Sequence, residues 1–175
     1  MRSALPLVVL AALARPAAAG EDEYQLGVVP AYAVVDFDSR LPSGAGIAVY
    51  GVYGLSDWLS LRASAVISWH PADADKDKML PAGTITVVGA FGGIRYAFDL
   101  LRTVPYLDLS LGMIYADGAG DNGSAFSYQA ALGFDRLQTP RWSWGAMVAY
   151  QGFISNFSKL PVYLYAGPTF TLRWD

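Results

Sequence analysis

Four charged residues stand out because each interrupts a segment of alternating apolar and small residues: Arg62, Arg95, Asp108 and Asp135. Amide side chains take equivalent positions in segments of the same kind, at Gln25, Gln129 and Gln151. Charges that a fold encloses must pair, because removing one partner of an enclosed pair costs about 3–5 kcal/mol. These residues therefore predict a polar network in an enclosed interior. That network either fills the interior or lines a narrow polar path through it.

His70 is the only histidine of the chain, and Ser68 precedes it by two residues. On an extended strand these two side chains share a face, so a Ser–His contact of the kind that activates a nucleophile is conceivable. A histidine at a strand end beside Pro71 is more often a solvated loop residue, and this is the interpretation we favour. We expect no catalytic residue, no enzyme and no cofactor.

Three aspartates at alternate positions are candidates for a calcium loop: Asp73, Asp75 and Asp77. Such loops take oxygen ligands from positions one, three and five, but the helical version also needs Gly at the sixth position and Glu at the twelfth. Lys78 and Thr84 occupy those two positions, and two lysines within the run neutralise the aspartates. A solvated charged loop is the simpler interpretation, so no metal site is expected.

The elements that position these residues are β-strands, and the segment 162–175 shows the pattern most clearly. Bulky apolar residues alternate there with Tyr, Gly, Thr and Arg, which is the period of a strand with one apolar face. A membrane strand needs about ten residues at a steep tilt. Eight segments qualify, at 24–35, 45–54, 58–69, 84–98, 105–115, 125–136, 142–152 and 162–175. The prediction is an all-β fold, an eight-stranded antiparallel up-and-down transmembrane β-barrel, in which the last strand pairs with the first.

An even number of strands returns both termini to one side of the membrane, where short turns are expected. The longer polar connections fall on the other side, at 36–44, 70–83, 116–124 and 153–161. The shorter turns are at 54–57, 99–104 and 137–141.

The turns also predict which enclosed residues meet. A hairpin closed around 99–104 sets Arg95 opposite Asp108, so we predict an ion pair between them. A hairpin closed at 120–121 sets Asp135 opposite Tyr106, which predicts a hydrogen bond. Because an eight-stranded barrel is barely wide enough for its own side chains, we favour a network that fills the lumen.

The N-terminus has the features of a secretory signal peptide, with Arg2, the apolar run 4–14 and small residues at 17–19. We therefore divide the chain into a signal peptide, residues 1–19, and an outer-membrane barrel domain, residues 20–175.

Two of the 12 basic residues lie in the signal peptide, which leaves 10 basic residues against 15 acidic residues in the barrel domain. That balance argues against a nucleic-acid partner. Without any Cys the chain has no disulfide and no thiolate site.

Aromatic residues gather near both ends of the predicted strands. The group on the side of the termini is Trp58, Tyr96, Phe98, Trp142, Trp144 and Trp174. The group nearer the long connections is Tyr32, Trp69, Tyr115, Phe126, Tyr128 and Tyr150. Two such groups predict the interfacial belts of a membrane barrel.

A soluble lipocalin-like barrel would instead enclose an apolar cavity and expose a polar face, whereas here the bulky apolar face opposes a face of small residues.

Several segments, in their order along the mature chain, carry a resemblance to a known family: GLSDWLSLRA (54–63), GGIRYAF (92–98), YLDLSLGMIYAD (106–117), YQAALGFDRL (128–137) and the terminal strand. The chain resembles the small eight-stranded outer-membrane barrels of the OmpA/OmpW-like kind. The resemblance implies an integral protein of the outer membrane of a Gram-negative bacterium, with a structural or surface role and no wide pore. A narrow, porin-like channel for small or hydrophobic solutes is the alternative. A lipid A-modifying enzyme is a further one, although Ala72 breaks the deacylase pattern of His followed two residues later by Ser.

The expected partners follow from that resemblance. They are outer-membrane lipid and lipopolysaccharide, together with the outer-membrane assembly machinery, which recognises the C-terminal strand. Such strands usually end on an aromatic residue, often Phe, whereas here Asp175 follows Trp174. We expect a monomer.

Overall fold

Eight long strands make up most of the described chain. The computed structural model describes residues 21–36, 41–74, 82–98, 102–118, 121–154 and 162–175. The strands are β1 (Tyr24–Asp36), β2 (Ser43–Gly54), β3 (Leu59–Ala72), β4 (Gly83–Ala97), β5 (Thr103–Gly118), β6 (Asp121–Thr139), β7 (Trp142–Phe153) and β8 (Val162–Trp174). All eight predicted strands are present, and the fold class is confirmed. The predicted signal peptide lies outside the described residues and stays a prediction.

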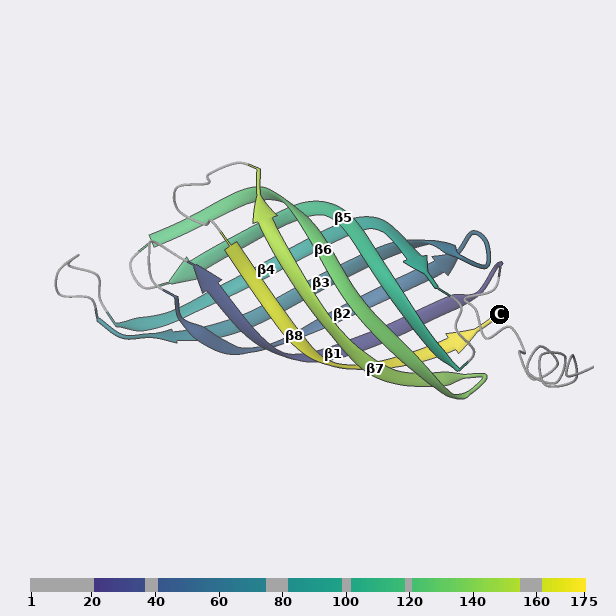
Figure 1. Cartoon of the computed structure of the whole chain (residues 1–175). Coiled ribbons are helices and arrows are strands. Elements are labelled where there is room, and N and C mark those ends of the chain that lie inside the picture. Colours follow the sequence, from purple (N-terminus) through teal and green to yellow (C-terminus); the bar gives the residue numbers. More distant parts are fainter. Residues whose placement is uncertain (1–20, 37–40, 75–81, 99–101, 119–120, 155–161) are drawn as a thin grey trace, which may run out of the picture.

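Each strand pairs antiparallel with its neighbours in the chain, and β8 returns to pair with β1, so the sheet closes into a barrel. Figure 1 shows the strands winding steeply around the barrel axis, with β1 beginning at the end where the C-terminus lies. We call this end the terminal end and the opposite one the outer end. No helix in the described ranges is long and apolar enough to cross a membrane.

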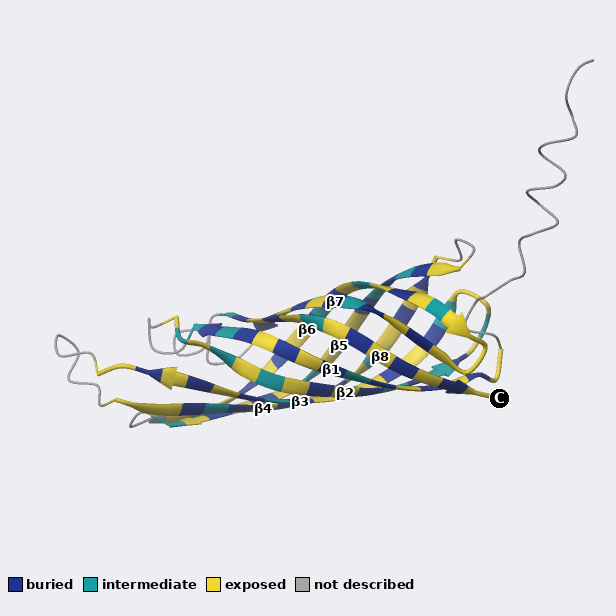
Figure 2. Cartoon of the chain, turned by 90° about the horizontal axis from the view of Figure 1, so that it is seen from below, coloured by how far each residue is buried: buried dark blue, intermediate teal, exposed yellow. Residues whose placement is uncertain are grey.

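Inward and outward residues alternate along every strand, as the bands in Figure 2 show. The predicted faces are confirmed, including those of the least clear strand, where Ile47 and Val49 are exposed and Tyr50 is buried. The reason is the pleat, which sends successive side chains to opposite faces of the sheet. Bulky residues therefore cover the outside, with Leu111 and Leu132 more than half exposed. An exterior of this kind suits a lipid environment.

Exposed aromatic rings form clusters near both ends of the barrel. At the terminal end Tyr24 stacks on Trp174 with ring centroids 6.3 Å apart, and Trp58 lies 5.4 Å from Tyr96. Towards the outer end the rings of Tyr128 and Tyr150, which are diagonal to each other across β6 and β7, lie 6.2 Å apart. These clusters contain residues of both predicted belts, in the positions where amphipathic rings meet a membrane interface.

The predicted loop at 116–124 is wrong. The β5–β6 ladder continues into this segment until Gly118 pairs with Asp121, so two residues connect the strands. Gly118 has a φ of +132°, a conformation that glycine adopts without a Cβ clash and that permits a tight reversal. This shift moves the whole β5–β6 register by two residues from the predicted one.

The seam between β1 and β8 closes the barrel but is interrupted at its middle. Pairing runs from Tyr24–Trp174 to Val28–Phe170 and resumes at Tyr32–Ala166. Pro30 and Pro168 occupy the gap, on opposite strands. Since proline has no backbone N–H, neither residue can donate a ladder hydrogen bond. The seam is therefore two short ladders separated by a proline pair.

Two glycines of the inner face make room for tyrosine rings on the neighbouring strand. Gly27 pairs with Tyr50, and Gly133 pairs with Tyr106. A Cβ at either glycine would overlap the facing ring. By contrast, Gly92 on the outer face has nothing within 4 Å of where a Cβ would lie.

These contrasting surroundings lead to a stability prediction. Gly27→Ala is expected to lower the free energy of unfolding by about 1–3 kcal/mol, because the added methyl forces the Tyr50 ring to move within a packed lumen. The matched control Gly92→Ala should change it by less than about 0.5 kcal/mol. Urea titration of the folded protein in lipid vesicles measures both changes. Equal effects of the two substitutions would contradict the packing role of Gly27.

Candidate functional site

The lumen contains all the buried charges of the described residues. They come from five of the strands and the residue before β1: Glu23, Arg62, Arg95, Asp108, Asp135 and Arg173. Three are acidic and three are basic, so at neutral pH the enclosed charge sums to zero. Such a balance is required when a narrow lumen excludes bulk water from its ion pairs.

Asp108 is the centre of the largest charge cluster. Arg95 Nε donates to Asp108 Oδ1 at 2.7 Å, and Arg95 Nη2 donates to Oδ2 at 3.0 Å, which makes the pair bidentate. Arg62 Nη1 lies 3.2 Å from the same Oδ2. The predicted Arg95–Asp108 ion pair is confirmed, because these residues are direct cross-strand partners in the β4–β5 ladder. Arg62, which the sequence placed in the network without a named partner, binds the same carboxylate from β3.

Two tyrosine rings enclose the guanidinium groups of this cluster. The guanidinium carbon of Arg95 lies 3.7 Å from the centroid of the Tyr106 ring and 5.0 Å from that of Tyr50. Arg62 also lies 5.0 Å from the Tyr50 centroid. Cation–π attraction is strong where water is excluded. The rings thus stabilise the excess positive charge that one aspartate between two arginines leaves.

The predicted Asp135–Tyr106 hydrogen bond is wrong. In the observed register Tyr106 faces Gly133, and Asp135 faces Val104, because the β5–β6 hairpin is centred between residues 119 and 120, one residue earlier than expected. Asp135 Oδ1 instead accepts a hydrogen bond from Thr169 Oγ1 at 2.8 Å, and its Oδ2 lies 3.7 Å from Arg173 Nη2.

Arg173 connects Asp135 to the first residues of the barrel. Its Nη1 lies 3.6 Å from Glu23 Oε1, and Gln25 Nε2 donates to the same oxygen at 3.4 Å. Sequence reasoning missed Glu23, which precedes the predicted strand. The sequence could have indicated Glu23, because it lies two residues before Gln25 and therefore faces the same side of an extended strand.

Glutamines form a separate pair further along the lumen. Gln129 and Gln151 face each other across β6 and β7, and Gln151 Nε2 donates to Gln129 Oε1 at 3.0 Å. The candidate network of Arg62, Arg95, Asp108, Asp135 and Gln129 is therefore not one cluster. Asp108 unites the two arginines, whereas Asp135 and Gln129 have partners of their own.

The outer half of the lumen is largely apolar, which the sequence reading did not predict. Buried apolar side chains from neighbouring strands meet there, including Val35, Val66, Ile85, Val87, Phe91, Ile114 and Phe153. The polar half adjoins the terminal end. Enclosed apolar residues were hard to recognise because single positions such as Val35 and Ile85 lie near strand ends, where the predicted faces stop.

Ser68, His70 and Tyr163 form a small polar group within this apolar half. Ser68 Oγ lies 2.8 Å from His70 Nε2, and Tyr163 donates its phenolic hydrogen to Ser68 Oγ at 2.9 Å. His70 Nδ1 lies 3.3 Å from the carbonyl oxygen of Pro42. The conceivable Ser–His contact is thus present, but the interpretation of His70 as a solvated loop residue is wrong. All three residues lie inside the barrel, and each has 0 % relative exposure.

The calcium candidates are only partly described. Asp73 is an exposed residue just after β3, and Asp75 and Asp77 lie outside the described residues. Within the described ranges, no group of three potential ligands is placed to hold a metal ion. The calcium interpretation stays an untested alternative.

Comparison with solved structures addresses the fold. No protein-family model and no curated protein matches the chain. Ail, the attachment invasion locus protein of Yersinia pestis, aligns with a TM-score of 0.64 at 14% identity over 88% of this chain and 99% of Ail. This chain has the fold of a small outer-membrane β-barrel.

Two further structures support the same fold. OprG of Pseudomonas aeruginosa aligns with a TM-score of 0.64 at 11% identity, over 90% of this chain and 99% of OprG. Neisserial surface protein A aligns with a TM-score of 0.59 at 17% identity, over 87% of this chain and 96% of that protein. Together with the apolar exterior, this fold indicates an integral outer-membrane protein.

The Asp108 cluster yields a second stability prediction. Asp108→Asn is expected to lower the free energy of unfolding by about 3–5 kcal/mol, because it leaves two buried guanidinium groups without their anion. Asp117→Asn, at an exposed position of the same strand, should change it by less than about 0.5 kcal/mol. Unfolding in lipid vesicles, followed by tryptophan fluorescence, measures both. A loss below 1 kcal/mol for Asp108→Asn would show that the cluster is not what holds the lumen together.

Proposed function

We propose that this protein is an integral outer-membrane barrel of a Gram-negative bacterium with a structural or surface role, whose lumen is filled by its own side chains and forms no wide pore. The observation that carries the proposal is the double obstruction of the lumen. A packed ion cluster occupies the half near the terminal end, and an apolar cluster occupies the outer half.

The ion cluster obstructs the lumen because its members reach across it. Arg62 on β3 lies 3.2 Å from Asp108 on β5, and its Nη2 lies 3.8 Å from Met147 Sδ on β7, on the opposite side of the barrel. Tyr50 on β2 similarly reaches Thr171 on β8, with 2.7 Å between the two hydroxyl oxygens. Eight strands leave room for side chains and little else, so contacts of this length across the lumen leave no wide aqueous path.

The apolar half argues against the alternative of a narrow polar channel. An ion crossing the lumen would have to lose its hydration between side chains such as Val35, Ile85 and Phe153, which offer no replacement ligands. A channel for hydrophobic solutes would in turn have to carry them past the paired charges around Asp108. Neither class of solute has a favourable environment along the whole axis.

The contact between Ser68 and His70 is the observation that favours an enzyme. A nucleophile and its base must be reachable by a substrate, and both side chains have 0 % relative exposure. Among the described residues, the two ring nitrogens of His70 contact Ser68 Oγ and the Pro42 carbonyl oxygen, and not the carboxylate that orients the ring in a Ser–His–acid arrangement. These facts support a non-catalytic role in which Ser68, His70 and Tyr163 stabilise the outer half of the lumen.

The partners in this proposal are those of a membrane barrel. Outer-membrane lipid covers the apolar exterior, and lipopolysaccharide lies around the outer end. The assembly machinery recognises β8, whose outward residues include Phe170, Leu172 and Trp174. The protein acts as a monomer and binds no nucleic acid.

Conductance tests the closed lumen. The purified protein in planar lipid bilayers is expected to give no steady single-channel current, because the lumen lacks a continuous polar path. Asp108→Leu should lower thermal stability while the bilayer stays silent. The control for insertion is protease protection of the same protein in vesicles.

A defined result would overturn the closed-lumen proposal. If the wild-type protein conducts, and Asp108→Leu changes that conductance while thermal stability stays fixed, Asp108 lines a path and does not close one. A lipid A modification assay with the same preparation gives the independent test of the enzyme alternative, for which activity lost in Ser68→Ala would be the supporting result.

A further inference from the structure

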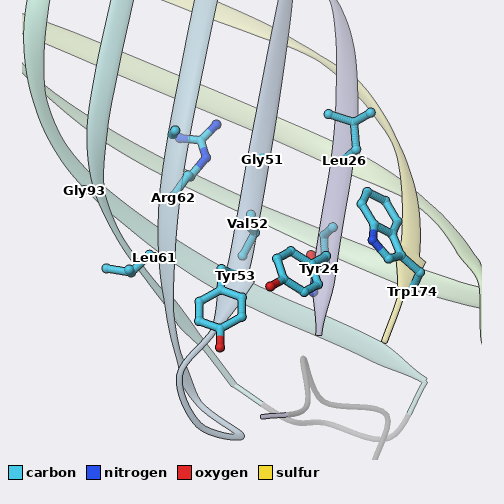
Figure 3. Close-up of a pocket in the computed structure, with 11 residues that line it drawn as sticks. Tyr24, Leu26, Gly51, Val52, Tyr53, Leu61, Arg62, Gly93 and Trp174 are labelled. Atoms are coloured by element: carbon cyan, nitrogen blue, oxygen red, sulfur yellow. The ribbon is translucent and has the colours of Figure 1, made fainter. Parts of the chain in front are cut away.

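Two of the apolar hollows that the described residues form on the lipid-facing surface are larger than a third, which measures about 330 Å³. One, of about 660 Å³, lies over β6, β7 and β8, where Ala146, Ala166 and Gly167 form a floor between larger side chains such as Phe134 and Val148. The other, of about 530 Å³, lies over β1 to β4 and β8. Figure 3 shows the rings of Tyr24, Tyr53 and Trp174 gathered at the terminal end of this second hollow. Each hollow could accommodate part of an acyl chain.

The charges beside the two hollows differ in sign. Three exposed arginines lie at the terminal end next to the β6–β8 hollow: Arg102, Arg136 and Arg141. The backbone places them on neighbouring elements. Leu137 N–H donates to the Arg102 carbonyl at 3.0 Å, and Arg136 faces Thr103 in the β5–β6 ladder. Arg173 N–H donates to the Arg141 carbonyl at 2.8 Å, which sets Arg141 beside the end of β8.

Within the described part of the chain, none of these three guanidinium groups takes part in an ion pair, in contrast to the three arginines of the lumen. Asp175, after β8, is the exposed acid on that side. Next to the β1–β4 hollow the exposed charges are acidic instead: Glu21, Asp22 and Asp57.

Aromatic residues connect the arginines to their hollow. Arg136 faces Trp144 across β6 and β7, and the next outward pair of those strands is Phe134 with Ala146, in the hollow itself. Moving from the terminal end towards the middle of the membrane, the outer surface is therefore basic, then aromatic, then apolar and recessed. This order matches a phospholipid, with its phosphate, glycerol backbone and acyl chain.

We propose that the surface of β5–β8 at the terminal end binds an anionic glycerophospholipid. Its phosphate contacts Arg102, Arg136 and Arg141, and one acyl chain occupies the hollow over Ala146 and Ala166. Guanidinium groups suit the phosphate because they donate two parallel hydrogen bonds to its oxygens. The inference rests on the membrane location in the proposed function, but not on the closed lumen.

Tryptophan quenching by brominated lipid tests the site. Two single-tryptophan proteins are needed, with the other tryptophans replaced by Phe: one keeps Trp144 beside the arginines, and the other keeps Trp58 beside Asp57. Each is folded into phosphatidylcholine vesicles containing a small, increasing fraction of phosphatidylglycerol brominated on its acyl chains. We expect Trp144 to be quenched at a lower fraction than Trp58. With brominated phosphatidylcholine as the only brominated lipid, the two should be quenched alike.

Substitutions separate the two parts of the site. The combined change Arg102→Gln, Arg136→Gln and Arg141→Gln is expected to lower the relative association constant of phosphatidylglycerol at Trp144 by about tenfold or more, since each basic residue near an anionic headgroup contributes substantially. Glu21→Gln with Asp57→Asn, which neutralises two charges beside the other hollow, is the control and should leave quenching of Trp144 unchanged. Ala146→Leu with Ala166→Leu fills the hollow and should also weaken association, whereas Ala65→Leu, on the outer face of β3, should not.

Equal quenching of Trp144 and Trp58 by brominated phosphatidylglycerol would overturn the proposal, as would an arginine variant that binds like the wild type. Resistance of each variant to unfolding by heat in detergent shows that it remains a closed barrel. The outcome is independent of the conductance experiment, because a conducting barrel could still bind this lipid and a silent barrel could fail to.

Discussion

The position of Asp108 between Arg62 and Arg95 is the interaction on which the interior depends. Two guanidinium groups share one carboxylate, with charged atoms 2.7 and 3.2 Å apart in the nearest pairs, and tyrosine rings cover the arginines. In a lumen this narrow no charge can turn to bulk water, so each must be neutralised where it stands. The same requirement accounts for Arg173 lying between Glu23 and Asp135. The buried charges of the described barrel are therefore two three-membered groups of opposite net sign, which balance each other.

The division of the lumen into a polar and an apolar half gives the fold two kinds of internal support. Ion pairs and hydrogen bonds fix particular side chains near the terminal end, whereas non-directional packing fills the outer half. Ser68, His70 and Tyr163 are the polar exception within the apolar half, and their side chains form hydrogen bonds with one another. Lipid is the solvent of the outer surface, as water is for a soluble protein. The outward side chains therefore need to be large and apolar, but they need little specific packing.

The sequence predicts features that depend on local order along the chain. Strand alternation gave the inward faces, and hairpin symmetry gave the Arg95–Asp108 pair, because both follow from residue numbers alone. The prediction failed along β5 and β6, where the turn is centred one residue earlier than expected and every cross-strand partner is therefore shifted by two residues. Contacts across the lumen, such as Arg62 with Asp108 or Thr169 with Asp135, join strands that are not neighbours. They depend on the tilt and stagger of the closed barrel, which no hairpin reveals.

The proline pair in the seam has a consequence for how the barrel closes during folding. Seven of the eight strand pairings join consecutive strands, so each requires only a short loop to form. The pairing of β1 with β8 joins residues at opposite ends of the barrel sequence, so it carries the largest single loop-closure cost of the eight pairings. With Pro30 and Pro168 at its middle, this ladder is not one continuous zipper. The ladder is divided into two segments, one between Tyr24–Trp174 and Val28–Phe170 and one from Tyr32–Ala166 onward, so either segment can pair before the other. The first segment encloses the polar half of the lumen and the second encloses the apolar half.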